Sequence, residues 1–172
     1  MFRNATDNIT IMSSYFLPGR IFRYAMERAC NREVKMRVIL AGTSDVRLAK
    51  HAERYIYRWL FKNNIEIYEF QKTVLHAKMA TYDNNWATIG SYNVNNISAF
   101  ASVELNLDIR DHTFCTGLNE HLEKIIREEC TQITEEEYRT RFSIFSRFIQ
   151  WASYTTVRIL FFLFTFYFKQ EK

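Results

Sequence analysis

The sequence predicts an α/β fold in which helices flank a mixed β-sheet. Strand-like and helical patterns alternate in the N-terminal part, two strand-like runs then follow with no helix between them, and a further alternating run precedes the last helices. Of the 172 residues, 48% are hydrophobic and only one is a proline, which is sufficient for the core of one domain. The same composition excludes a disordered or collagen-like chain.

The N-terminal part alternates strands with helices. The expected elements are strands at 9–16, 34–40 and 65–70 and helices at 20–31 and 46–63. Pro18-Gly19 marks the turn between the first strand and the first helix. Strands that alternate with helices in this way form a sheet with parallel neighbours and right-handed crossovers.

The pattern then changes to strands without intervening helices. Runs at 74–82 and 86–92 are joined by Asp83-Asn84-Asn85, and because Asp and Asn tolerate turn conformations, these runs predict a hairpin. Residues 103–110 alternate between apolar and polar side chains, which is typical of a strand. Helices are expected at 113–130, capped by Asp111, and after the capping-box pair Thr134 and Glu137.

The hairpin carries the residues that indicate chemistry. These are His76, Lys78, Asp83, Gly90, Ser91 and Asn93. Residues two apart on a strand share a face, so His76 is expected beside Lys78, and Ser91 beside Asn93. A neutral imidazole nucleophile beside an ammonium, a hydroxyl and an amide suits attack on a phosphodiester, whose oxygens need donors as charge develops. This chemistry requires no metal, and no cofactor is expected.

The spacing HxK(x)4D(x)6GSxN resembles the signature of the phospholipase D superfamily at every signature position. Over residues 5–140 the chain looks like the C-terminal half of bacterial cardiolipin synthases. The similar stretches are 15–20, 38–46, 67–69 and 75–78. The two differ after Asn93, where the family commonly has Asn-Leu-Asp-x-Arg-Ser and this chain has Asn-Val-Asn-Asn-Ile-Ser. Substrate preference and rate are therefore open, whereas the nucleophile matches.

The resemblance implies a role for each site residue. His76 would attack phosphorus, while Lys78, Ser91 and Asn93 would bind the phosphate. Glu104, which follows His76 by 28 residues, would accept a proton from one imidazole nitrogen and aim the other. Alternatively, Glu104 is a solvated carboxylate facing Arg110. Asp83 belongs to the motif, but at the head of a turn it is expected to support the backbone rather than to transfer protons.

Two such motifs meet in this superfamily, and this chain contains one. His51, His112 and His121 lack a lysine two residues later, so none supplies a second motif. Three arrangements remain, namely a homodimer that joins two copies of His76, a partner chain that carries the other motif, or an inactive half of a longer synthase. Because the chain starts almost directly at a strand, a fragment or a split protein is one expectation, whereas dimerisation is the preferred condition for activity.

An aromatic and basic segment ends the chain. Residues 142–168 include 11 aromatic side chains, and residues 138–172 carry a net charge of +5 against +4 for the whole chain. The expected division is a phospholipase D-like domain at 1–140 and a membrane-interfacial tail at 141–172. The tail is predicted to be an amphipathic helix that places Phe142, Phe145, Ile149 and Ala152 opposite Ser143, Arg147, Gln150 and Ser153. The alternatives are packing on the domain, a dimer contact, or a tilted spanning helix in which Arg158 snorkels.

The resemblance implies a phosphatidyltransferase of the cardiolipin synthase type. It would act on a phosphatidylglycerol-like lipid at the cytoplasmic side of a bacterial inner membrane. A single-motif nuclease or phosphodiesterase is the main alternative, because a basic protein attracts phosphates. The basic residues, however, cluster with aromatics in the tail, and no nucleic-acid-binding motif is present, so the preferred interpretation includes no nucleic-acid partner.

Overall fold

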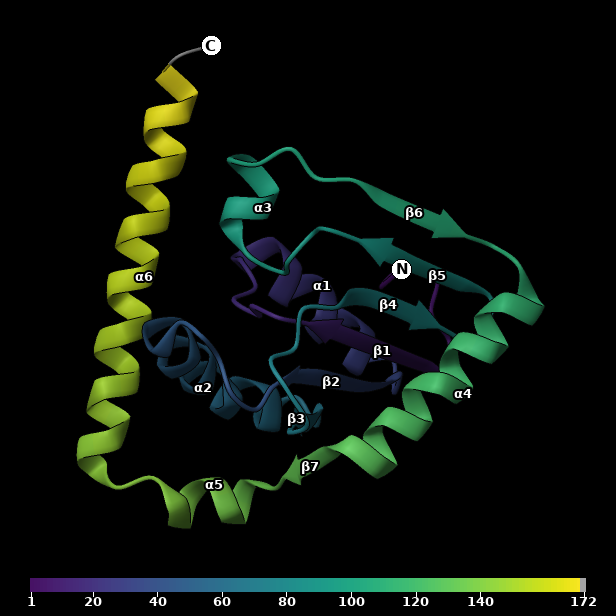
Figure 1. Cartoon of the computed structure of the whole chain (residues 1–172), viewed down its shortest axis with the longest axis horizontal. Helices are drawn as coiled ribbons and strands as arrows, with labels where there is room; N and C mark the ends of the chain where they lie inside the picture. Colours follow the sequence, from purple (N-terminus) through teal and green to yellow (C-terminus); the bar gives the residue numbers. More distant parts are fainter. Residues whose placement is uncertain (171–172) are drawn as a thin grey trace.

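The protein folds around a seven-stranded mixed sheet with helices on both faces (Figure 1). The computed structural model describes residues 1–170, and the side chains of residues 1–164. The elements in chain order are β1 (Asn8–Ser13), α1 (Arg20–Cys30), β2 (Lys35–Ala41), α2 (Arg47–Lys62), β3 (Glu66–Phe70), β4 (Lys78–Tyr82), β5 (Trp86–Gly90), α3 (Asn96–Phe100), β6 (Asn106–Ile109), α4 (His112–Glu129), β7 (Cys130–Ile133), α5 (Glu135–Arg141) and α6 (Ile144–Gln170). The mixed α/β sheet predicted from the sequence is confirmed.

The strand order places the β4–β5 hairpin inside the sheet rather than at an edge. The order is β6-β5-β4-β1-β2-β3-β7, in which β1, β2 and β3 run parallel and the other pairs are antiparallel. Ser13, the last residue of β1, pairs with Lys78, the first residue of β4. The carboxyl end of β1 therefore meets the beginning of β4, which is where the signature histidine and lysine lie.

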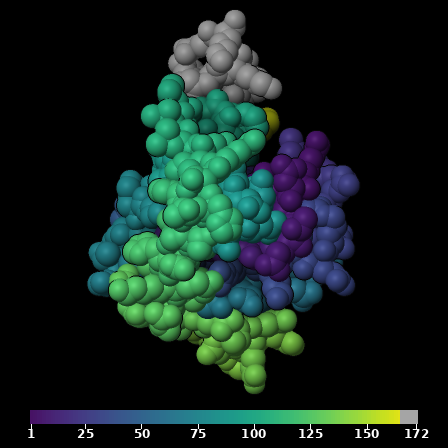
Figure 2. Space-filling model, turned by 90° about the vertical axis from the view of Figure 1, so that its right-hand side faces the viewer, coloured from purple at the N-terminus to yellow at the C-terminus, as the bar shows by residue number. Residues whose placement is uncertain are grey.

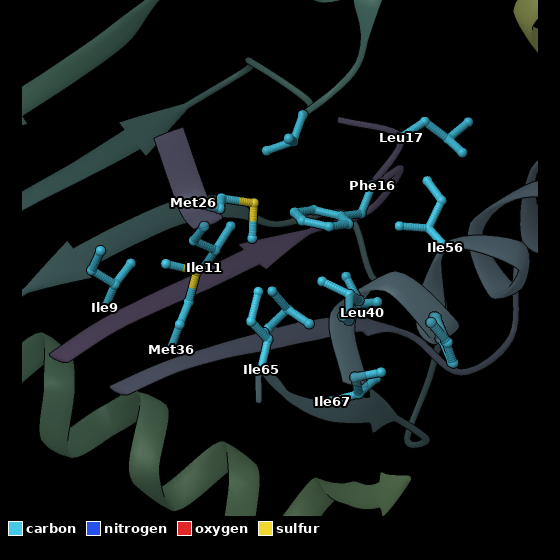
Figure 3. Packing of buried hydrophobic residues seen from close by; sticks show 14 of the residues in the cluster. Ile9, Ile11, Phe16, Leu17, Met26, Met36, Leu40, Ile56, Ile65 and Ile67 are labelled. Carbon is cyan, nitrogen blue, oxygen red and sulfur yellow. The ribbon is translucent and has the colours of Figure 1, made fainter. Parts of the chain in front are cut away.

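Side chains that alternate along the central strands build a core on each face. One core joins Ile9 and Ile11 of β1 to Met26 of α1 and Ile56 of α2, as Figure 3 shows. The other core lies under α4 and includes Leu122. Figure 2 shows the green atoms of α4 along the side of the molecule that faces the viewer. The pleat of each strand thus sends alternate residues to opposite cores.

Several elements differ from the sequence prediction. β4 begins at Lys78, so His76 precedes the strand, and β6 covers only Asn106–Ile109 of the strand expected at 103–110. The short elements α3 and β7 were not predicted. The hydrogen bonds of the capping box at Thr134 and of the Asp111 cap are present as predicted.

Helix α6 packs along α2, and its far end extends beyond the sheet (Figure 1). Tyr154 stacks on Tyr55 of α2 with ring centroids 4.7 Å apart, and Gln150 accepts a 2.7 Å hydrogen bond from the Tyr138 hydroxyl. Gln150 and Ser153 are consequently buried. This part of the helix therefore packs on the domain, which is one of the alternatives given by the sequence, and two of its predicted polar positions face the protein. Within the described residues, no helix has both the length and the apolar character to cross a membrane.

Candidate active site

His76 lies in the segment that leads into β4, with an exposed side chain. The prediction that His76 and Lys78 stand on one strand is therefore wrong, although the two residues are in contact. The Lys78 ammonium donates a 2.9 Å hydrogen bond to the backbone carbonyl of His76. In the part of the chain that the structure describes, the imidazole has no hydrogen-bond partner, so both ring nitrogens are open to a ligand.

Lys78 is a charged residue at the edge of the core, with 7% of its surface exposed. Loss of solvent lowers the pKa of its ammonium, and the nearby negative charge of Glu104 partly opposes that effect. A poorly hydrated cation interacts strongly with an anion because little water screens it. Lys78 can therefore supply positive charge beside the His76 segment.

Ser91 and Glu104 lie together, on the loop after β5 and on the segment before β6. The Ser91 hydroxyl donates to Glu104 and accepts a 3.0 Å hydrogen bond from the backbone N–H of Leu105. Ser102 donates a further 3.0 Å bond to the same carboxylate. These serine hydroxyls lower the pKa of Glu104, with Ser91 the largest cause. Among the described residues Glu104 makes no hydrogen bond to His76, so its role in orienting the imidazole stays a prediction.

Gly90 allows the close approach that brings Ser91 and Glu104 together. A Cβ at this position would collide with the carbonyl oxygen of Leu105 and the side chain of Asn106. The backbone N–H of Ser91 donates a 3.0 Å bond to that same Leu105 carbonyl. Glycine in the signature is thus required by the distance between the two chain segments rather than by its φ angle.

Asn93 has unused hydrogen-bonding capacity next to this group. Its backbone N–H donates to the Ser98 hydroxyl at 3.2 Å, whereas its side-chain oxygen is buried and has no partner among the described residues. Buried polar atoms of this kind are rare, and they often mark a place that a ligand or water fills. Because rotation of the amide exchanges its oxygen and nitrogen, Asn93 can present either a donor or an acceptor.

Asp83 lies at the opposite end of the hairpin from His76. Five residue-to-residue steps separate Lys78 from Asp83, which corresponds to about 16 Å along an extended chain. Its carboxylate accepts hydrogen bonds from the backbone N–H groups of Thr6, Asp7 and Asn8 at 2.7, 3.0 and 2.8 Å. Burial favours a higher pKa for Asp83, but the bonds from these backbone groups outweigh it and lower the pKa. This geometry favours support of the N-terminal segment over contact with substrate.

The structure places a tyrosine and an aspartate at the end of the sheet where the His76 segment lies. The pattern of polar residues in the sequence did not single out these two residues. The Ser14 hydroxyl donates to the carbonyl of Ala77 at 3.4 Å, so the segment after β1 lies beside the His76 segment. Its next residue, Tyr15, donates a 2.6 Å hydrogen bond to Asp45, which follows β2. This bond to a carboxylate raises the pKa of Tyr15 to about 12. The available signal was topological, since the carboxyl ends of parallel strands share one edge.

One departure from the family pattern has a structural explanation. Asn95 stands where the family commonly has aspartate, and its side chain accepts a 2.9 Å hydrogen bond from the Ser98 backbone as the N-cap of α3. Asparagine caps helices as well as aspartate does. The replacement therefore keeps the local structure of the loop. Within the described residues, no group of three or more His, Cys, Asp or Glu side chains is arranged to hold a metal ion.

A mixed sheet with an exposed histidine and a buried lysine at the start of a central hairpin indicates a phospholipase D-like domain. A family model described as "Cardiolipin synthase, PLD-like domain" matches residues 1–126. The chain belongs to this family. It is 36% identical over 135 residues to cardiolipin synthase B of Salmonella typhi. This alignment covers 78% of this chain and 33% of that protein. The Escherichia coli protein of the same name is 33% identical over the same length.

Solved structures show the same fold. Nuc, a phospholipase D family member from Salmonella typhimurium, superposes with a TM-score of 0.66 at 16% identity and covers 78% of this chain and 86% of its own. Phosphatidylserine synthase from Haemophilus influenzae gives a TM-score of 0.71 at 14% identity, over 92% of this chain and 40% of its own. The chain spans about a third of the length of the cardiolipin synthases that it matches.

Proposed function

We propose that this chain is the catalytic half of a phosphatidyltransferase of the cardiolipin synthase type, working through a phosphohistidine at His76. The observation that supports this most is the exposed, unpartnered imidazole beside Lys78, within a domain that belongs to the cardiolipin synthase family. Lys78, Ser91 and Asn93 are proposed to bind the phosphate. Their ammonium, hydroxyl and amide groups would stabilise charge on its oxygens.

The proposed reaction has two displacements at phosphorus. His76 attacks the phosphodiester of a phosphatidylglycerol-like lipid, so that a nitrogen–phosphorus bond forms and the bond to the head-group alcohol breaks. A second histidine protonates the leaving alkoxide. The hydroxyl of an acceptor lipid then attacks the phosphohistidine and gives up its proton, which releases the imidazole. Transfer to an alcohol requires that water is kept from the intermediate.

The second histidine is proposed to come from another copy of the chain. The sequence holds one such motif, and the site is incomplete without the other. An exposed apolar row, Val103, Leu105 and Leu107, lies on and just before the edge strand β6; we call it the β6 stripe. It borders Glu104 and hence the site. Contiguous exposed apolar residues are typical of an interaction surface.

Helix α6 is proposed to hold the enzyme on an anionic membrane surface. Ile144, Phe148, Trp151 and Ile159 recur at helical spacing and are exposed; they form the outer stripe of α6. The side that faces the protein buries Gln150, Ser153 and Val157. A helix that packs on its domain along one side and exposes aromatic residues on another suits insertion at headgroup depth, and its basic residues suit anionic lipid. The proposed side of the membrane is the cytoplasmic one.

The full chain incubated with vesicles of radiolabelled phosphatidylglycerol tests this function. We expect labelled cardiolipin to form, and His76→Ala to lower the rate by about a thousandfold or more because the nucleophile is lost. Acid-labile label should be trapped on the unmodified chain only. Single-stranded DNA is the comparison substrate, and cleavage of DNA without cardiolipin formation would reject the transferase in favour of a nuclease.

A further inference from the structure

A buried charged network lies between α2 and β3 and is not explained by the proposed chemistry. It joins Lys50, Glu53, Arg54 and Tyr57 of α2 to Glu69 of β3. The Lys50 ammonium is 2.8 Å from Glu53 and 3.0 Å from Glu69, and it also donates to the carbonyl of Ala41. Apolar residues often give equal stability in such a place, so stability is a weak reason for burying these charges.

Glu53 has a second partner outside this network. Only 3% of its surface is exposed, and each carboxylate oxygen has its own donor. Oε1 accepts from Lys50 at 2.8 Å, and Oε2 accepts from the backbone N–H of Phe16 at 3.2 Å. Phe16 follows β1 and lies in the core. Glu53 therefore fixes the backbone of the segment that leaves the sheet beside His76.

The segment at 13–17 in turn holds the loop after β5. The Leu17 N–H donates to the carbonyl of Val94 at 2.8 Å, and the Val94 N–H donates to the Ser13 hydroxyl at 3.4 Å. Both backbone groups of Val94 are thus bound by this segment. Val94 is buried and lies next to Asn93, so displacement of the segment shifts that amide.

We propose that Glu53 is a positioning residue for phosphate binding, because its carboxylate fixes segment 13–17 and through it the loop that carries Ser91 and Asn93. This inference rests on the proposed function for its catalytic consequence. A small displacement of a binding group is enough to lower a rate substantially. The backbone consequence is independent of which substrate is used.

Replacement of Glu53 by glutamine separates this role from general stability. The new amide has one oxygen, so either the Lys50 ammonium or the Phe16 N–H loses its acceptor and faces an NH₂ group. Glu69→Gln is the matched control, since Glu69 is equally buried and also pairs with Lys50 but has no contact with Phe16. The double variant Lys50→Met, Glu53→Gln removes the competing cation and leaves the amide oxygen for Phe16.

Two measurements on the full chain in detergent micelles test the proposal. Glu53→Gln is expected to speed amide hydrogen exchange at Leu17 and Val94 about tenfold or more relative to Val38 of β2, and to lower kcat to a similar degree. The exchange ratio is the rate at Leu17 or Val94 divided by the rate at Val38. Glu69→Gln should leave this exchange ratio unchanged, and the double variant should return it to the value of the unmodified chain. Equal ratios in the two single variants would overturn the proposal. If the unmodified chain does not turn over lipid, the proposed function fails, and the exchange ratios still decide the role of Glu53.

Discussion

Asp83 is a signature residue whose visible partners are all backbone and hydroxyl groups of the N-terminal segment. It accepts from Thr6, Asp7 and Asn8. Asp83 and Asn84 both have positive φ, 50° and 52°, as in the tight turns that join two antiparallel strands. The contacts of Asp83 therefore join the turn of the hairpin to the start of β1, which gives a structural reason for an aspartate at this position of the signature.

This arrangement predicts a pH-dependent contribution of Asp83 to stability. Its pKa in the folded protein lies below the ordinary value of 3.8, so its stabilisation is present above that pH and is lost as pH falls further. Asp83→Asn, which tolerates the positive φ, should lower the free energy of unfolding by about 2 kcal/mol at pH 7 and by less near pH 3. Urea unfolding at both pH values measures the difference.

Asp108→Asn is the control for that prediction, because the side chain of the exposed Asp108 makes no hydrogen bond in the part of the chain that the structure describes. It should change stability little at either pH. An equal loss from Asp83→Asn at pH 7 and pH 3 would contradict the ionic explanation.

The signature spacing was sufficient to predict the hairpin, but not the exact backbone position of His76 relative to β4. His76 lies before β4 because Lys78 is the first residue that pairs with β1. Glu53 was not predicted, since an acid on an amphipathic helix normally faces water and its two partners come from distant parts of the chain. Such tertiary contacts have no local sequence signal.

Among the elements, the long periodic ones were predictable and the short ones were not. The single-turn helix α3 begins at a cap, Asn95, whose partner Ser98 is polar and common in loops. β7 follows α4 directly and is a strand because it pairs with β3, as Ile67 pairs with Ile133. A strand of four residues defined by a non-local pairing has little pattern of its own.

The outer stripe of helix α6 is expected to bind membranes through its exposed aromatic residues. Phe148, 59% exposed, contacts Trp151 in the outer stripe with ring centroids 5.6 Å apart. Phe148→Asp should weaken binding to phosphatidylglycerol vesicles about tenfold or more, because an aromatic side chain stabilises by about 2 kcal/mol when it leaves water. Co-sedimentation measures binding, and a blue shift of tryptophan fluorescence reports burial of the stripe.

Thr156→Asp is the matched control, since Thr156 is exposed on the same helix but outside the outer stripe. It adds the same charge and should weaken binding much less. Equal losses from the two variants would mean that charge repulsion, rather than insertion of the stripe, determines binding. Vesicles of zwitterionic phosphatidylcholine, which carry no net charge, should bind the protein more weakly than anionic vesicles.

In the whole molecule, the strands that carry the candidate site residues lie next to one another on one half of the sheet. β7 occupies one end of the strand order and β6 the other, and the hairpin lies between β6 and the parallel strands. Sequence patterns alone predicted parallel neighbours but not this order, because the order depends on which strands pair across long separations. This order makes β5 and β6 neighbours, and so brings the Glu104 carboxylate to the Ser91 hydroxyl.

The β6 stripe predicts how two copies meet. Leu105 and Leu107 are 75% and 64% exposed, so replacing them with aspartate removes apolar contact area without disturbing a core. We expect light scattering to show that the unmodified chain is a dimer. The double variant Leu105→Asp, Leu107→Asp should be a monomer that forms cardiolipin at least about tenfold more slowly, because no second histidine reaches the leaving group.

Ile21→Asp, at an 83% exposed position on α1, controls for loss of an exposed apolar residue and should stay dimeric and active. A fully active monomer would show that one motif suffices, whereas a dimer that survives both aspartates would place the contact on another surface.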